Sequence, residues 1–292
     1  MSSTAQPRHP RQPQRQPRRW PQQQQRPQQR RRSWWLRLAG EGGVVGWPLA
    51  GVTAGLALWW AAAGWWGVPG WLLPHPLDVA TTLVGLRGYL AAHTTVTLWE
   101  VAAGYALAVA GGVPAGLLLA TCRPLRLATA PLLVALHAVP KLPLAVPLVI
   151  ALGFGTTPKI IMVVLVCAFP IVLATTAGLR STPPELVELA RSMCATRWQT
   201  HLKIAIPYAL PQILLGCKQA APLAVIGAVV GELFGALGGL GYVIRSAGTD
   251  LAQVWAALLI LAALSLALFH TVTAAEKLLT PWTNTNQPAK GV

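Results

Sequence analysis

Charged residues are scarce in this chain of 292 residues. They make up 11% of it, and only 8 residues are acidic against 23 lysines and arginines. A soluble globular domain carries about a quarter charged residues, whereas 54% of this chain is hydrophobic and its mean hydropathy is +0.50. The shortage of charge therefore argues against an ordinary soluble domain and predicts a protein that crosses the membrane several times.

Patterns typical of metal sites, disulfides and catalytic centres are also missing. The four cysteines form no Cys-x-x-Cys pair and have no histidines at ligand spacing, so we expect neither a disulfide nor a metal. No recurrent set of serine, histidine and acid occurs. The Gly-rich run 235–241 follows no strand and lacks the Gly-Lys-Ser/Thr of a phosphate-binding loop. We therefore expect no catalytic residue and no cofactor bound by this chain.

Arginine, glutamine and proline dominate residues 1–33. Nine arginines lie between Arg8 and Arg32, and without them the net charge falls from +15 to +6. This composition buries too little apolar surface to offset the entropy of ordering, so residues 1–43 are predicted to be a disordered tail. The tail either binds anionic lipid or nucleic acid, or only keeps the N-terminus in the cytoplasm. The simpler role is sufficient, and we expect no nucleic-acid partner.

Six segments are apolar over the roughly 20 residues that a membrane span needs. Prolines at 140, 143 and 147 are predicted to break the third. With both ends inside, six spans leave only Arg87, Lys159 and Arg245 on the outer side, as the positive-inside rule favours. The membrane domain then covers 44–280, and 281–292 is a cytoplasmic tail. The predicted spans are 44–66, 95–120, 131–154, 159–179, 207–230 and 251–275.

A charged segment with a helical pattern interrupts the apolar sequence between the fourth and fifth spans. Thr182 followed by Glu185, and Thr196 followed by Gln199, both have the spacing of a capping box at a helix start. Two short helices are therefore predicted, with a turn near Cys194. Such a pair, held at the membrane surface, transmits motion better than a flexible loop.

This segment resembles the cytoplasmic "EAA" loop of ABC-importer permeases. The shared frame is Glu188-x-Ala190, three residues, position 194, nine residues, and then Ile204-Ala-Ile-Pro207. Cys194 stands where the motif has glycine, and Leu189 where it has its first alanine. Looser similarity to the nitrate, sulfonate and taurine branch extends over about 74–275, in Pro74-His-Pro-Leu-Asp-Val79, Val139-Pro-Lys-Leu-Pro-Leu144, Leu152-Gly-Phe-Gly155, Glu232-Leu-Phe-Gly235 and Gly239-Leu-Gly-Tyr242.

The resemblance implies an all-α integral membrane permease with about six transmembrane helices and a coupling loop at 182–207. It implies two ATPase subunits as partners, which bind the ATP, an extracytoplasmic solute-binding protein and a homodimer, because each chain has one loop and an importer needs two. Residues implied in ATPase docking are Glu185, Glu188, Leu189, Ala190, Cys194, Ala195, Ile204 and Pro207.

Ionisable side chains inside spans are costly and are therefore functional candidates. Lys141 and Lys218, with Gln219, are candidates for the substrate path, where the lysines would attract an anion such as a sulfonate, taurine or nitrate. The alternative is an internal ion pair with Glu100. A separate prediction is an outer gate around the Gly-rich run, formed by Glu232, Gly239 and Gly241 and touched by the solute-binding protein.

Two other classes of protein stay open at this point. A stand-alone ion-coupled transporter would favour inverted repeats and buried acidic residues, and no clear repeat is found. A membrane-embedded enzyme would require a catalytic set that the chain does not present. Both are weaker interpretations than a permease subunit in the cell membrane.

Overall fold

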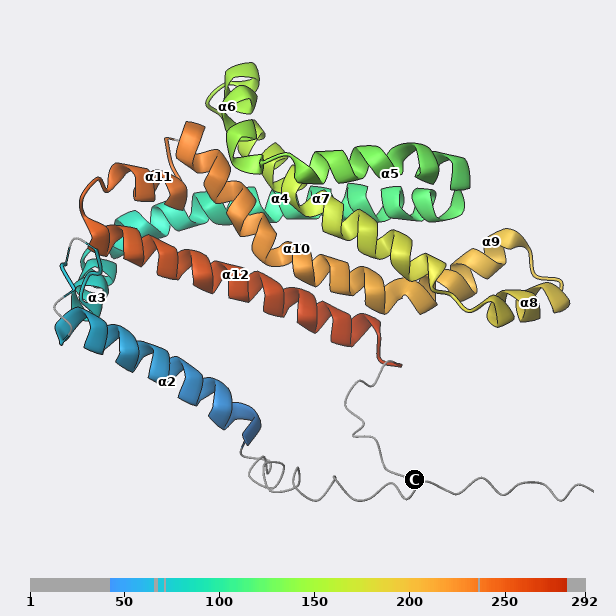
Figure 1. Cartoon of the computed structure of the whole chain (residues 1–292), viewed down its shortest axis with the longest axis horizontal. Helices are drawn as coiled ribbons and strands as arrows, with labels where there is room; N and C mark the ends of the chain where they lie inside the picture. The colour runs from blue at the N-terminus through green and yellow to red at the C-terminus, as the bar shows by residue number, and fades with distance from the viewer. Residues whose placement is uncertain (1–42, 66–67, 71, 236, 283–292) are drawn as a thin grey trace, which may run out of the picture. The chain divides into compact units, whose positions relative to one another are not determined.

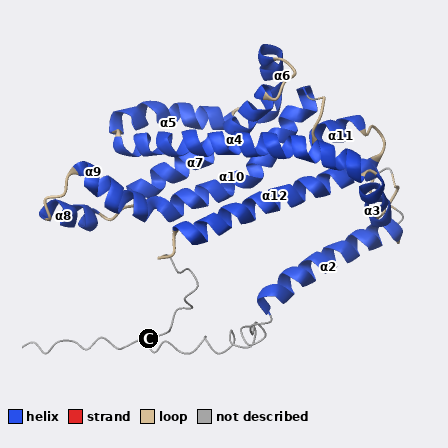
Figure 2. Ribbon diagram, turned by 180° about the vertical axis from the view of Figure 1, so that it is seen from behind, coloured by secondary structure: helices blue, strands red, loops and turns tan. Residues whose placement is uncertain are grey.

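The computed structural model describes residues 43–65, 68–70, 72–235 and 237–282, and every regular element in these ranges is a helix (Figure 1; Figure 2). The predicted all-α membrane fold is confirmed. The predicted tails lie almost wholly outside these ranges and stay predictions. The helices are α2 (Gly43–Gly64), α3 (Pro76–Gly85), α4 (Arg87–Thr121), α5 (Arg123–Ala138), α6 (Lys141–Leu152), α7 (Thr157–Arg180), α8 (Pro184–Ser192), α9 (Arg197–Thr200), the π-helical turn η2 (His201–Ala205), α10 (Ile206–Gly235), α11 (Leu240–Ser246) and α12 (Leu251–Leu279).

Four helical stretches in the described ranges are long and apolar enough to cross a membrane. They are α4, α7, the continuous run Arg197–Gly235 and α12, and they contain the predicted second, fourth, fifth and sixth spans. The apolar helices Leu49–Gly64 and α6 are shorter. The chain divides into two compact units after residue 57. The helices from α3 to α12 all belong to the second unit.

The predicted third span, 131–154, is two helices rather than one. α5 and α6 point in different directions (Figure 1), and the residues between them, Val139 and Pro140, are extended with ψ of 127° and 119°. Proline has no N–H to donate, and it disfavours the helical conformation of the preceding residue. Pro143 and Pro147 lie within α6, so Pro140 alone separates the helices.

Helix α7 packs between α4 and α10, and glycines make the close approach possible. A Cβ atom added to Gly116 of α4 would lie 2.5 Å from the Cβ of Thr175, and one added to Gly231 of α10 would lie 2.9 Å from the Cα of Lys159. Side chains at these positions would force the helices apart. α7 begins at the end of the bundle where α11 lies, which we call the α11 end. It ends near α8, which we call the α8 end (Figure 1; Figure 2).

Candidate functional site

The 182–207 loop folds into two short helices, as its sequence predicts, but the first one begins differently. The N-cap of α8 is Pro183, so Thr182 stands one residue too early to cap it. The Thr182 hydroxyl instead donates to the Leu179 carbonyl at 2.9 Å, in the last turn of α7. The predicted capping box of Thr182 and Glu185 is therefore wrong.

Cys194 occupies a backbone conformation that favours glycine. Its φ of +57° is the only positive value at a non-glycine residue in the described ranges. The Ala195 N–H donates to the Ala190 carbonyl at 3.0 Å, and the Cys194 N–H donates to the Arg191 carbonyl at 2.9 Å. These two bonds are those of a Schellman motif, whose left-handed residue is usually glycine. The Cβ atom of Cys194 costs this turn about 1 kcal/mol.

The second helix begins as predicted and continues into the membrane span. Gln199 N–H donates to Thr196 Oγ1 at 3.2 Å, and Thr196 N–H donates to Gln199 Oε1 at 2.9 Å, so this capping box is confirmed. In η2 the Ile206 N–H donates to the His201 carbonyl, five residues earlier. This wider turn leads into Pro207, which has no N–H of its own. The second helix is thus continuous with α10.

The two helices present acidic and apolar side chains on an exposed surface. Leu189, Met193 and Trp198 are 58%, 75% and 72% exposed, although large apolar side chains are usually covered. Of the predicted docking residues, Ala190 is buried and anchors α8. The exposed ones are Glu185, Glu188, Leu189 and Cys194, and the half-buried ones are Ala195, Ile204 and Pro207.

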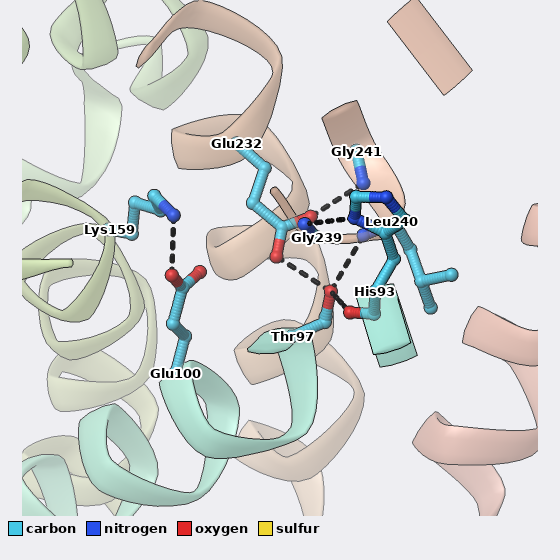
Figure 3. Close-up of polar contacts among 8 residues, drawn as sticks. All are labelled: His93, Thr97, Glu100, Lys159, Glu232, Gly239, Leu240 and Gly241. Atoms are coloured by element: carbon cyan, nitrogen blue, oxygen red, sulfur yellow. Dashed lines mark hydrogen bonds and ion pairs between the residues drawn. The ribbon is translucent and has the colours of Figure 1, made fainter. Parts of the chain in front are cut away.

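At the α11 end, Glu232 closes the turn between α10 and α11 (Figure 3). Its Oε2 accepts the Gly241 N–H at 2.5 Å, and its Oε1 accepts the Thr97 hydroxyl at 2.7 Å. Thr97 Oγ1 in turn accepts the Leu240 N–H at 2.8 Å. Gly239, which precedes α11, has a φ of +104° that suits glycine. The three residues predicted for a gate are thus neighbours in the fold.

Three further residues join this group. His93 Nδ1 accepts the Gly239 N–H at 3.0 Å. Lys159, predicted to lie in an outer loop, is buried and its Nζ lies 2.5 Å from Glu100 Oε1. The sequence points to Glu100 because an ionisable side chain within a span is costly, whereas no sequence signal points to His93, Thr97 or Lys159. We call His93, Thr97, Glu100, Lys159, Glu232 and residues 239–241 the Glu232 cluster.

The predicted path residues lie in two different surroundings. Lys218 Nζ is 2.6 Å from Glu276 Oε2 of α12, and Lys141 Nζ donates to the His137 carbonyl at 2.6 Å. Neither lysine is the partner of Glu100. The predicted ion pair of Lys141 or Lys218 with Glu100 is therefore wrong, because Glu100 pairs with Lys159. Partners of this kind depend on helix rotation, which hydropathy does not report.

An open groove of about 390 Å³ runs beside α10. Gln219 lines it with Gln212 and with His137, whose ring stacks on Phe169 at 3.9 Å between centroids. Lys141 lines an adjoining hollow of about 110 Å³ that shares His137 and Phe169. Lys141 and Gln219 therefore line two neighbouring hollows that share His137 and Phe169. In the described part of the chain, no three residues of the metal-binding types come together to hold an ion.

Residues 112–285 match the family model for the binding-protein-dependent transport system inner membrane component, which is more than half of the chain. The chain belongs to this family. The permease is 36% identical over 226 residues to the formylaminopyrimidine transport permease protein of Halalkalibacterium halodurans, covering 76% of this chain and 90% of that one. It is 29% identical to the taurine transport system permease protein of Escherichia coli, covering 78% and 86%.

The fold of the permease is similar to a solved structure of the MetNI methionine ABC transporter. The TM-score is 0.60 at 20% sequence identity, over 67% of this chain and 98% of that chain. The matched family region contains the 182–207 loop, the groove and Glu232, while His93, Thr97 and Glu100 precede it. Family membership favours an ABC importer subunit over the stand-alone transporter and the enzyme.

Proposed function

We propose that this ABC importer permease binds its ATPase subunit through the 182–207 loop. The observation that carries the proposal is the continuity of the loop with α10 through η2, because a helix that is not interrupted transmits displacement. The exposed apolar residues Leu189, Met193 and Trp198 provide contact area, and Glu185 and Glu188 provide charge for specificity.

The proposed mechanism is mechanical. ATP is bound by the partner subunit, and closure of its nucleotide sites moves the 182–207 loop. The loop follows α7 and precedes α10 in the chain, so both helices move with it. This movement exposes the groove along α10 to one side of the membrane and then to the other. The permease would act as a homodimer, with both chain ends in the cytoplasm and a solute-binding protein delivering solute at the α11 end, near the Glu232 cluster.

The docking proposal is tested by Glu188→Arg, which reverses an exposed charge and leaves the buried contacts of α8 in place. We expect loss of stoichiometric co-purification with the ATPase and loss of ATP-driven uptake. Thr249→Arg, an exposed position at the α11 end, serves as the control and retains the ATPase. An intact complex and full uptake in Glu188→Arg would refute the proposal.

For the solute, we propose a small anion such as a sulfonate, taurine or a nitrate-like compound. The similarity to the taurine permease supports this class, and Lys141 supplies a cation in the hollow that adjoins the groove. Lys218 supplies none, because Glu276 balances its charge. Gln212 and Gln219 can donate hydrogen bonds to anionic oxygens along the groove.

A further inference from the structure

The Glu232 cluster is a set of buried polar side chains that connects α4, α7 and α10 at the α11 end (Figure 3). Thr97, Glu100 and Glu232 are fully buried, and Lys159 is 5% exposed. Burying such a group costs free energy unless its hydrogen-bonding atoms and charges are satisfied. The contacts within the cluster allow its hydrogen bonds and its charges to be counted.

Counting the hydrogen bonds leaves one carboxyl oxygen of the cluster without a partner among the described residues. Glu232 has both carboxyl oxygens occupied, by the Thr97 hydroxyl and the Gly241 N–H. Glu100 Oε1 accepts from Lys159, whereas Glu100 Oε2 is buried without a hydrogen-bond partner among the described residues. The Glu100 and Glu232 carboxyl groups lie next to each other (Figure 3). A hydrogen atom between them would satisfy the remaining oxygen.

The count of charges gives the same result. Two carboxylates and the Lys159 ammonium would leave one negative charge buried. Other titratable groups on the neighbouring elements do not remove it. His93 of α4 accepts the Gly239 N–H through Nδ1, so that nitrogen carries no proton. Arg245 of α11 is exposed, and its Nη1 donates to the Leu233 carbonyl at 3.2 Å, where water screens its charge.

We propose that Glu100 and Glu232 bind one proton between them, as a carboxylic acid hydrogen-bonded to a carboxylate. With Lys159 the group is then neutral as a whole. The proton also replaces the repulsion of two facing carboxylates by a charge-assisted hydrogen bond. The site is a proton-binding site, and it goes beyond the transport role proposed above.

The proton stabilises the turn between α10 and α11. Glu232 and Thr97 hold the N–H groups of Gly241 and Leu240, so displacement of either side chain releases the start of α11. At high pH the proton dissociates, and the two carboxylates repel each other across the point where they hold this turn. The α11 end is therefore more open in alkaline solution.

Infrared difference spectroscopy of the full-length permease in lipid nanodiscs, between neutral and alkaline pH, tests the site. We expect the carbonyl band of a protonated carboxylic acid, sensitive to exchange into D2O, which disappears at high pH. Glu100→Gln and Glu232→Gln should each abolish this band, because the remaining carboxylate is neutralised by Lys159. Glu276→Gln, in the other ion pair, is the matched control and retains the band.

Lys159→Met provides a test in the opposite direction. Without the ammonium, both carboxyl groups are neutral only if each holds a proton, so the band should increase about twofold. A wild-type spectrum without the band, or a band that persists in both single Gln variants, overturns the proposal. So does a band that appears only in sodium-free buffer, because a bound sodium ion would then neutralise the site.

Discussion

Lys159 and Glu100, 59 positions apart in the chain, form an ion pair between α7 and α4 with 2.5 Å between Nζ and Oε1. Their side chains are 6% and 1% exposed. Lys159 lies in the first turn of α7, and the last turn of α7 leads into the 182–207 loop. One helix therefore carries a buried charge of the Glu232 cluster at one end and the predicted docking loop at the other.

Replacing Lys159 with Met should lower the stability of the bundle by about 3 kcal/mol, because the buried Glu100 and Glu232 carboxyl groups lose their counter-charge and must bind a second proton to stay neutral. Adding Glu100→Gln should recover part of the loss. Lys218→Met is the control, since the Lys218–Glu276 pair is partly exposed and should cost about 1 kcal/mol or less. Thermal unfolding in detergent measures all of these. Equal losses in Lys159→Met and Lys218→Met would contradict the importance of burial.

Cys194→Gly should stabilise the turn between α8 and α9 by about 1 kcal/mol, because glycine adopts a φ of +57° without a Cβ penalty. Cys194→Ala retains the Cβ atom and should give no such gain. Hydrogen exchange of the α8 and α9 amides compares the two variants. If alanine protects these amides as well as glycine does, the turn is not strained by Cys194.

Lys141→Gln should raise the apparent KM for an anionic solute about tenfold, the effect of losing a hydrogen bond to a charged group. Lys218→Gln should leave the KM nearly unchanged, because Lys218 is directed to Glu276 on α12. Uptake into proteoliposomes that contain the complete transporter measures both. The reverse order of effects would place the anion path on the other side of α10.

Gly116→Ala should destabilise the contact of α4 with α7 by about 1 to 3 kcal/mol, since its Cβ would meet the Thr175 Cβ at 2.5 Å. Gly111→Ala has no atom within 4 Å of its new Cβ and should be neutral or stabilising by about 0.5 kcal/mol, because alanine favours the helix. Unfolding midpoints of the two variants should therefore move apart. A shared direction would mean that α4 and α7 separate easily.

Much of the fold follows from signals within a few residues of one another. Apolar length predicts α4, α7, α10 and α12, and Thr196 with Gln199 predicts the start of α9. Cys194 stands where the motif has glycine, and the structure shows that its φ of +57° is a conformation that favours glycine. The prolines predict a break in the third span, although three prolines are candidates and only Pro140 separates two helices.

The sequence alone determined the membrane-spanning helices, the charged loop between two of them and the family to which the chain belongs, because hydropathy, capping and motif spacing are local. Only the tertiary structure decided that Lys159 pairs with Glu100, that Lys218 pairs with Glu276 and that Thr97 joins Glu232. Those partners depend on how each helix is rotated and where it crosses its neighbour. Glycines and side-chain volumes on several helices set both together, so no single stretch of sequence contains the answer.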